Sequence, residues 1–280
     1  MLAYEFMQRA LIAAVIVGLV SPLIGVFLVQ RRLALLGDGM GHVAIAGVGL
    51  AFLTGTEPVL TALIVSILGA FILELVRHKS KAAGDLALAL IFYGGIAGGV
   101  LLTSLAGGKA STALNQYLFG SLSTVSTQDF VALGGAAIAL LLVLMKFGTQ
   151  IFAMSLDAET AKIQGIRVTA MSVLLTAMAA VTVVVGMRTV GLLLVSAIMI
   201  VPVAAAQQLT HSFKTTGLLA SAIGVFSAIG GLTVSFYVDV PPGPTIVLIA
   251  LGVFIILAVT TTSLHLRHRH EIQEQSPHRH

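Results

Sequence analysis

Long apolar segments separated by short polar connections run along the whole chain. Each segment is close to the roughly 20 residues that a helix needs to cross the hydrocarbon core of a membrane. Because a helix satisfies its own backbone hydrogen bonds in lipid, the pattern predicts an all-α, polytopic membrane bundle of about eight or nine helices. The expected spans lie near residues 10–29, 34–55, 58–76, 85–106, 129–147, 168–187, 190–209, 216–237 and 244–263.

Composition supports an integral membrane protein. The 280 residues are 58% hydrophobic and 9% charged, and the mean hydropathy is +1.06, whereas a soluble domain has about 25% charged residues. The first apolar segment is followed by Arg31 and Arg32 and not by a small-residue cleavage site, so we expect a retained helix. The chain has no cysteine, which excludes disulfides and thiolate metal sites.

The basic residues predict an orientation. If the first connection is cytoplasmic, 12 of the 15 Lys and Arg residues lie inside, and only Arg9, Lys109 and Arg188 lie outside. The N-terminus is then outside and the C-terminus inside. The sequence pI of 9.6 reflects these loops and does not indicate a nucleic-acid partner. We expect a transmembrane domain over residues 1–264 and a disordered cytoplasmic tail over residues 265–280.

Two connections stand out. Residues 112–128 are too polar for a lipid-facing span but contain aromatic anchors, so we expect an external interfacial or re-entrant turn. The internal connection over residues 148–169 contains a predicted short amphipathic helix. Asp157 and Glu159 suit the N-terminal end of its dipole, and Gly165 suits its C-terminal end.

Small residues recur at four-residue spacing, which lets membrane helices approach closely. Gly37 and Gly41 form one such pair, and Gly94 and Gly98 form another. Pro202 lies inside a predicted span, where it removes a helix hydrogen bond and favours a kink. That kink has either a structural role or a role as a gate.

Asp38 and His42 are the candidate metal ligands. Most other acids lie near span ends, with Glu57 and Asp129 near outer ends and Glu74 near an inner end, and the other histidines lie at inner ends or in the tail. Ionisable side chains inside a span usually mark a binding site or a transport path. Side chains four residues apart share a helix face, so one carboxylate and one imidazole can reach one ion.

Other interpretations of this pair remain open. Asp38 follows Gly37 near the start of its span and can act as a helix N-cap, while His42 can be a hydrogen-bonded helix contact. The predicted boundaries place Asp38 only about a turn above the inner end, whereas transporter sites usually lie near the midplane. Two ligands are also few for one ion, so water, another helix or a second copy of the chain must supply the rest.

The tail is rich in histidine and arginine. His268, His270, His278 and His280 can bind metal weakly, although a basic tail attracted to anionic lipid explains the composition equally well. No Gly-rich loop ending in Gly-Lys-Ser/Thr and no His-Glu-x-x-His motif is present in the sequence. We therefore expect a subunit that is not itself an enzyme.

Five segments in order resemble the permease subunits of metal-ion ABC importers, the group that transports zinc, manganese or iron. Together they cover nearly the whole chain. The segments are Arg31 to His42, Tyr117 to Ser121, Asp157 to Ala161 with Gly165, Val190 to Ala197 with Pro202, and Pro242 to Pro244.

The resemblance implies a type II-like ABC permease fold and a set of partners. These are a second copy of the chain, two cytoplasmic ATPase subunits that hydrolyse ATP, and an extracytoplasmic metal-binding protein. By the same resemblance, Asp38 and His42 coordinate the ion near the dimer axis. The segment near residues 155–167 corresponds to the coupling helix, and the matching residues are Asp157, Ala158, Glu159, Ala161 and Gly165.

Zinc is the cargo that the sequence favours, with manganese or iron as the alternative and no permanently bound cofactor. Two Asp and two His permit tetrahedral zinc, and the filling Gly39-Met40-Gly41 resembles zinc-type permeases. An ATP-independent cation transporter and a membrane scaffold without transport activity are the competing functions.

Overall fold

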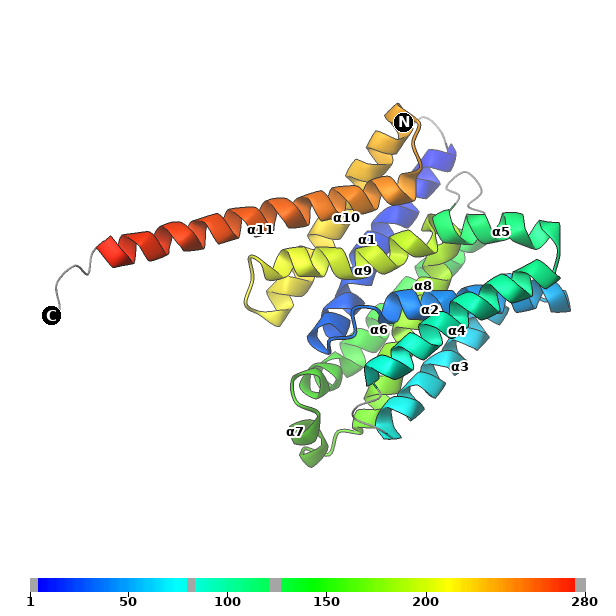
Figure 1. The fold of residues 1–280 in the computed structure, drawn as a ribbon, viewed down its shortest axis with the longest axis horizontal. Helices are drawn as coiled ribbons and strands as arrows, with labels where there is room; N and C mark the ends of the chain where they lie inside the picture. The colour runs from blue at the N-terminus through cyan, green and yellow to red at the C-terminus, as the bar shows by residue number, and fades with distance from the viewer. Residues whose placement is uncertain (1–4, 80–83, 121–126, 275–280) are drawn as a thin grey trace.

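The computed structural model describes residues 5–79, 84–120 and 127–274. These residues form helices joined by short connections, with no strand among them, as the all-α prediction requires (Figure 1). The helices are α1 (Glu5–Gln30), α2 (Leu36–Thr54), α3 (Pro58–Lys79), α4 (Gly84–Leu105), α5 (Gly108–Phe119), α6 (Thr127–Leu156), α7 (Ala158–Ile163), α8 (Val168–Val190), α9 (Leu192–Gln207), α10 (Phe213–Val238) and α11 (Pro242–Glu274).

Eight of the described helices are long and apolar enough to cross a membrane. The remaining expected span, residues 190–209, corresponds to α9, which has 16 residues and is therefore about 24 Å long at 1.5 Å per residue. That length is shorter than the roughly 30 Å hydrocarbon core. The expected number of eight or nine helices is thus confirmed, with α9 as the short member.

The bundle is arranged around α1, α2 and α8. Most of α1 and α2 is buried within this chain, whereas little of α6 or α11 is buried. The helix α2 packs against α3, α4, α8 and α9, and α1 packs against α9 and α10. The candidate metal ligands therefore lie on one of the most enclosed helices of the bundle.

Close packing around α2 depends on glycine. A Cβ atom added at Gly41 would lie 1.9 Å from a methyl carbon of Leu192, and one added at Gly47 would lie 2.6 Å from the Cα atom of Ala62. Without a strong hydrophobic force between helices in lipid, such contacts supply the packing energy. The two glycines thus let α9 and α3 approach α2 from different sides.

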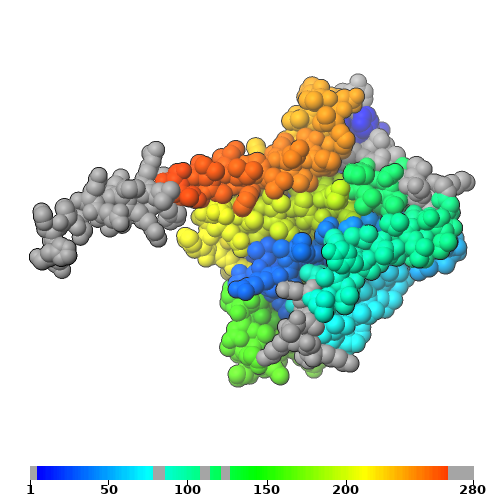
Figure 2. All heavy atoms as spheres, in the orientation of Figure 1, coloured from blue at the N-terminus to red at the C-terminus, as the bar shows by residue number. Residues whose placement is uncertain are grey.

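Two peripheral segments differ from simple expectation. The first part of the polar segment, residues 112–119, belongs to the helix α5, which begins at Gly108. An interfacial or re-entrant turn was expected over residues 112–128, of which residues 121–126 lie outside the described part. The helix α11 projects from the body of the protein (Figures 1 and 2). It continues past residue 264 to Glu274 (Figure 1). The division into a domain and a disordered tail stays a prediction.

Candidate functional site

A tight turn connects α1 to α2. Arg32 adopts a left-handed conformation with φ of 58°, and the backbone N–H of Leu33 donates to the carbonyl of Leu28 at 2.8 Å. This is the pattern of a Schellman helix end, with arginine where glycine is usual. The turn places Asp38 in the first turn of α2, where the helix dipole favours a carboxylate.

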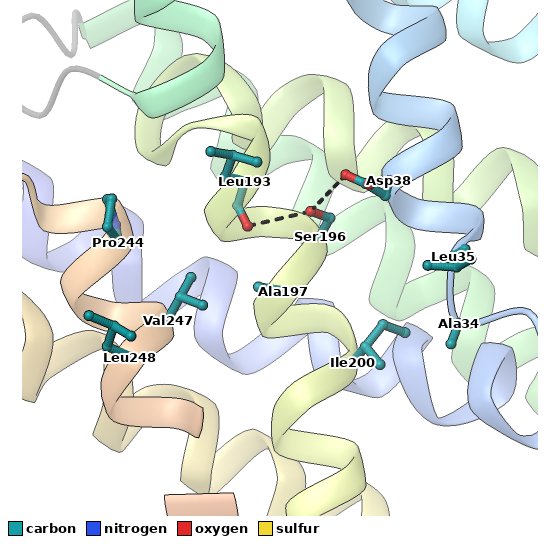
Figure 3. A pocket seen from close by; sticks show the side chains of 10 residues that line it. All are labelled: Ala34, Leu35, Asp38, Leu193, Ser196, Ala197, Ile200, Pro244, Val247 and Leu248. Atoms are coloured by element: carbon teal, nitrogen blue, oxygen red, sulfur yellow. Dashed lines mark hydrogen bonds between the residues drawn. The ribbon is translucent and has the colours of Figure 1, made fainter. Parts of the chain in front are cut away.

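Asp38 is not the N-cap of α2. Leu35 occupies the cap position, and no side chain caps the helix there. The carboxylate instead accepts a long hydrogen bond from the hydroxyl of Ser196 on α9, with 3.4 Å between Oγ and Oδ1 (Figure 3). The capping interpretation is therefore wrong, and Asp38 is half-buried between α2 and α9.

Two cavities meet at Asp38. One has a volume of about 570 Å³ and lies between α9, the start of α2 and α11, and the other has a volume of about 390 Å³ and lies toward α4. The walls of both cavities are mainly apolar, and Asp38 is the one carboxylate that lines each of them. The first is lined by Ala34, Leu35, Asp38, Leu193, Ser196, Ala197, Ile200, Pro244, Val247 and Leu248 (Figure 3).

His42 lies one helical turn beyond Asp38. Its ring meets the ring of Phe92 on α4 edge to face, with 4.9 Å between centroids and an angle of 81°. Phe92 also lines the smaller cavity. Among the described residues, no group of three or more His, Cys, Asp or Glu side chains could hold a metal ion. One chain thus presents two candidate ligands on one face of α2.

The neighbours of Asp38 indicate its height in the bundle. Ser196 is one turn from the start of α9, close to the junction between α8 and α9. Arg31, seven residues before Asp38, contacts Ser172 near the opposite end of α8. Asp38 therefore contacts the part of α9 that follows the junction with α8, whereas Arg31 contacts the start of α8.

The short internal helix is formed by local signals. Asp157 caps α7 because its Oδ1 atom accepts from the backbone N–H groups of Glu159 at 3.0 Å and Thr160 at 3.3 Å. Gly165 ends the segment in a left-handed conformation with φ of 83°. The hydrogen bond from the hydroxyl of Thr160, followed by those from the two backbone N–H groups, holds the pKa of Asp157 below its usual value of 3.8. The cap is therefore ionised at neutral pH.

Residues of α7 face in two directions. Ala161 is buried and packs into the main core cluster, whereas Ala158 and Glu159 are exposed. Ile163 is 87% exposed, although it is a large apolar side chain. We therefore assign Ala161 to holding α7 against the bundle, and we identify Ile163 as a candidate contact that sequence reasoning missed.

The other predicted site residues lie elsewhere. Pro202 is buried within α9, and the helix continues on both sides of it. His268 and His270 fall on the last part of α11, while His278 and His280 lie outside the described residues. Pro202 does not line either of the cavities at Asp38.

Charged residues near the span ends form two groups that sequence reasoning missed. Glu74 is 5% exposed, and its Oε1 atom lies 2.6 Å from Nη1 of Arg77. At the other end of α8, Nε of Arg188 lies 2.7 Å from Oδ1 of Asp129, and its Nη1 lies 3.6 Å from Oε1 of Glu57. The i, i+3 spacing of Glu74 and Arg77 was a signal of pairing, but not of burial.

Comparison with known proteins identifies the family. The model of the ABC 3 transport family matches residues 3–261. The chain is 32% identical over 253 residues to the manganese import system permease protein ScaB of Streptococcus gordonii, covering 90% of each chain. It is 33% identical over 256 residues to the manganese transport system membrane protein MntC of Halalkalibacterium halodurans, covering 91% of this chain and 87% of the relative.

A solved structure agrees with the sequence comparison. The structure of PsaBC from Streptococcus pneumoniae in complex with Fab superimposes with a TM-score of 0.81 and 31% identity, and 91% of each chain is covered. The family model spans nearly the whole sequence, and the fold also matches. The family resemblance that was drawn from the five segments is therefore confirmed. This chain belongs to the ABC 3 transport family.

Proposed function

We propose that this chain is the membrane-spanning subunit of an ATP-driven importer of divalent transition-metal ions, with manganese as its cargo. The observation that carries the proposal is the position of Asp38, a carboxylate on an enclosed helix that opens onto two mainly apolar cavities. Its companion His42 lies one turn further along α2. Ionisable groups in such surroundings mark ion pathways.

The choice of manganese rests on the relatives and on the donor atoms. Similar proteins are named for manganese import or transport, and this supports manganese above the zinc that the sequence favoured. The hydroxyl of Ser196 adds an oxygen beside Asp38. Carboxylate and hydroxyl oxygens suit manganese, whereas a tetrahedral zinc site more often uses nitrogen or sulfur ligands.

A second copy of the chain completes the site in this proposal. One protomer supplies Asp38 and His42, and a two-fold dimer doubles each contribution. The face beside Asp38 carries large exposed apolar side chains, among them Leu35 and Tyr93, which are 66% and 68% exposed. Apolar side chains exposed on a membrane helix ordinarily face lipid, but an ionisable side chain within a span usually faces protein or water. Because Asp38 opens onto this face, its position supports a dimer interface around the ion path.

Two further partners act at opposite ends of the bundle. We assign α7 to the contact with a cytoplasmic ATPase subunit, because the helix is exposed, is capped at both ends and presents Ile163. The opposite end, which contains Arg188 and Glu57, then receives an extracytoplasmic metal-binding protein. This places the N-terminus outside and the C-terminus inside, as the distribution of basic residues predicts.

Transport follows alternating access in this proposal. The binding protein delivers the ion, and Asp38 and His42 of both protomers hold it while the helices tilt under the action of the ATPase. Two carboxylates offset the charge of a divalent ion, which lowers the cost of carrying it through a region of low dielectric constant. The hydroxyl of Ser196 lies 3.4 Å from Asp38 and lines the same cavity, although its single proton also has the carbonyl oxygen of Leu192 at 3.1 Å as an acceptor.

Radiomanganese uptake into proteoliposomes that contain the whole complex tests the proposal. We expect Asp38→Ala and His42→Ala to abolish uptake while the complex still assembles. Matched controls are Asp239→Asn, at the C-cap of α10, and His211→Ala, at an exposed position before α10. Both controls should transport normally.

Competition with unlabelled metals tests the cargo in the same vesicles. We expect excess manganese to suppress the uptake of label more strongly than zinc or iron. Normal uptake in both site variants would refute the ligand assignment. Suppression by zinc at concentrations where manganese has no effect would instead identify zinc as the cargo.

A further inference from the structure

A buried polar cluster lies in the bundle apart from Asp38 and His42. We call it the inner polar cluster, and it consists of Arg31, Glu74, Arg77, Ser172 and Thr176. The carboxylate is its centre: Oε1 accepts from Nη1 of Arg77 at 2.6 Å and from the hydroxyl of Thr176 at 2.9 Å, while Oε2 accepts from the hydroxyl of Ser172 at 2.6 Å. The same serine accepts from Nη1 of Arg31 at 2.6 Å.

The cluster is costly to bury, which indicates a role beyond stability. Glu74 is 5% exposed, and one carboxylate offsets two guanidinium groups. Replacing a buried ion pair with apolar side chains is often neutral or stabilising, so a buried pair is weak evidence for a purely stabilising function. Its hydrogen bonds instead fix one specific arrangement of the elements that carry it.

Three elements meet in this cluster. Arg31 belongs to the turn that leads into α2, Glu74 and Arg77 lie near the end of α3, and Ser172 and Thr176 lie near the start of α8. The turn ends in the first turn of α2, where Asp38 lies. The cluster therefore holds the segment that carries the candidate ligand against the first turns of α8.

The start of α8 is also attached to α7. The backbone N–H of Ile166 donates to the carbonyl of Ala161 at 3.0 Å, and Ala161 is buried against the bundle. Two residues later, α8 begins at Val168. A cavity of about 110 Å³ lies between Val168, Thr169 and the inner polar cluster, so the guanidinium groups have space into which they can shift.

We propose that Glu74 is a positioning residue that couples movement of α7 to the turn between α1 and α2, which leads directly to Asp38. This inference rests on the proposed function, in which α7 contacts the ATPase. When α7 and the start of α8 move together, Ser172 moves with them, and its hydrogen bonds to Glu74 and Arg31 transmit the displacement to the entrance of α2. Coupling of this kind requires a physical connection that both ends can bias, and the cluster supplies it.

Glu74→Gln in the assembled complex tests the inference. Glutamine keeps the shape, and its single carbonyl oxygen can still accept from one of the two hydroxyl groups. It removes the charge that holds the two arginines. We expect the number of manganese ions taken up per ATP hydrolysed to fall at least about fivefold, the lower range of typical coupling effects. ATP hydrolysis, assembly and metal binding by Asp38 and His42 should persist.

Three comparison variants separate coupling from simple stability. Glu5→Gln removes a carboxylate from an exposed pair with Arg9 and should leave the ratio unchanged. Glu74→Asp keeps the charge and should recover part of the ratio. Ser172→Ala breaks the connection between Glu74 and Arg31 without changing any charge, so it should also lower the ratio, and it provides the test if Glu74→Gln does not fold.

The possible results are distinct. An unchanged ratio in both Glu74→Gln and Ser172→Ala, with normal uptake by the wild-type complex, would overturn the coupling role alone. A parallel fall of uptake, ATP hydrolysis and thermal midpoint in both variants would show a structural role and would also overturn it. No uptake by the wild-type complex would overturn the proposed function, and the coupling role with it.

Discussion

The contact between α1 and α9 should not tolerate a methyl group at Gly25. A Cβ atom added there would lie 1.7 Å from the carbonyl oxygen of Met199. Real Cβ atoms stay at least 3.0 Å from such an atom. The Gly25→Ala variant therefore requires the two helices to move apart by about 1.3 Å. The obstacle is backbone, which cannot rotate away as a flexible side chain can.

The stability loss can be worked from this displacement. Overpacking a well-packed core typically costs about 1–3 kcal/mol, and a rigid backbone clash should fall near the upper end. A gap of about 0.5–1 Å already forfeits a quarter to a half of the dispersion energy between facing atoms. The higher helix propensity of alanine offsets about 1 kcal/mol of this loss. We expect a net loss of about 2 kcal/mol.

The displacement should also reach the candidate metal site. The side chain of Met199 faces Gly37, where an added Cβ would lie 3.3 Å from its sulfur. On the same helix, Ser196 lies one turn before Met199 and donates to Asp38. Movement of α9 away from α1 therefore changes the contacts of the first turn of α2, and manganese uptake should fall together with stability.

Unfolding by sodium dodecyl sulfate in mixed micelles measures the free-energy change, and proteoliposome uptake measures the functional one. Gly135→Ala on α6 is the matched control because nothing lies within 4 Å of the added Cβ. It should be neutral or stabilising by up to about 1 kcal/mol. Equal stability and uptake of the Gly25→Ala variant and the wild type would refute the reasoning.

Three other variants test individual charged groups. Glu74→Ala leaves two guanidinium groups without their buried carboxylate and should lower the free energy of unfolding by about 3–5 kcal/mol, measured in the same micelles. Arg188→Ala removes the guanidinium 2.7 Å from Asp129 and should cost about 1–3 kcal/mol; the loss should be smaller in an Asp129→Ala background, as a double-mutant cycle would show. Because the hydroxyl and N–H of Thr160 hold the pKa of Asp157 below its usual value of 3.8, the ionised cap stabilises α7 above that value and is lost only as the pH falls through the lowered one. Hydrogen exchange of α7 should therefore show no titration of this cap from about pH 5 to 8, while Asp157→Ala should weaken protection throughout that range.

Local signals predicted the short internal helix almost completely. The expected segment over residues 157–165 contains α7 with Asp157 as its N-cap, and Gly165 has the left-handed conformation that a helix end favours. These features depend on groups within three or four residues of one another. Membrane spans were predicted for a similar reason, since length and hydropathy are properties of each segment alone.

Contacts between distant segments were less accessible to sequence reasoning. Glu74 was placed at a span end by hydropathy, but its burial depends on Ser172, 98 residues later in the chain. Of the predicted pair on α4, an added Cβ at Gly98 would be in ordinary contact with Ala46 at 3.8 Å, but the closest approach to α2 is made by other glycines. Gly94 has nothing within 4 Å of an added Cβ, whereas its neighbour Gly95 would meet the backbone of His42 at 2.8 Å.

Both ends of the ligand-bearing helix are attached to α8. Before α2, Arg31 donates to Ser172 near the start of α8; after α2, Glu57 lies 3.6 Å from Arg188 near the end of α8. With 23 residues, α8 is about 34 Å long, so the two attachments are far apart along one continuous helix. A tilt of α8 displaces its two ends in opposite directions and therefore changes the orientation of α2, not only its position. The segment that leads into α8 is hydrogen-bonded to α7. A movement of α7 therefore changes the orientation of the helix that carries Asp38 and His42.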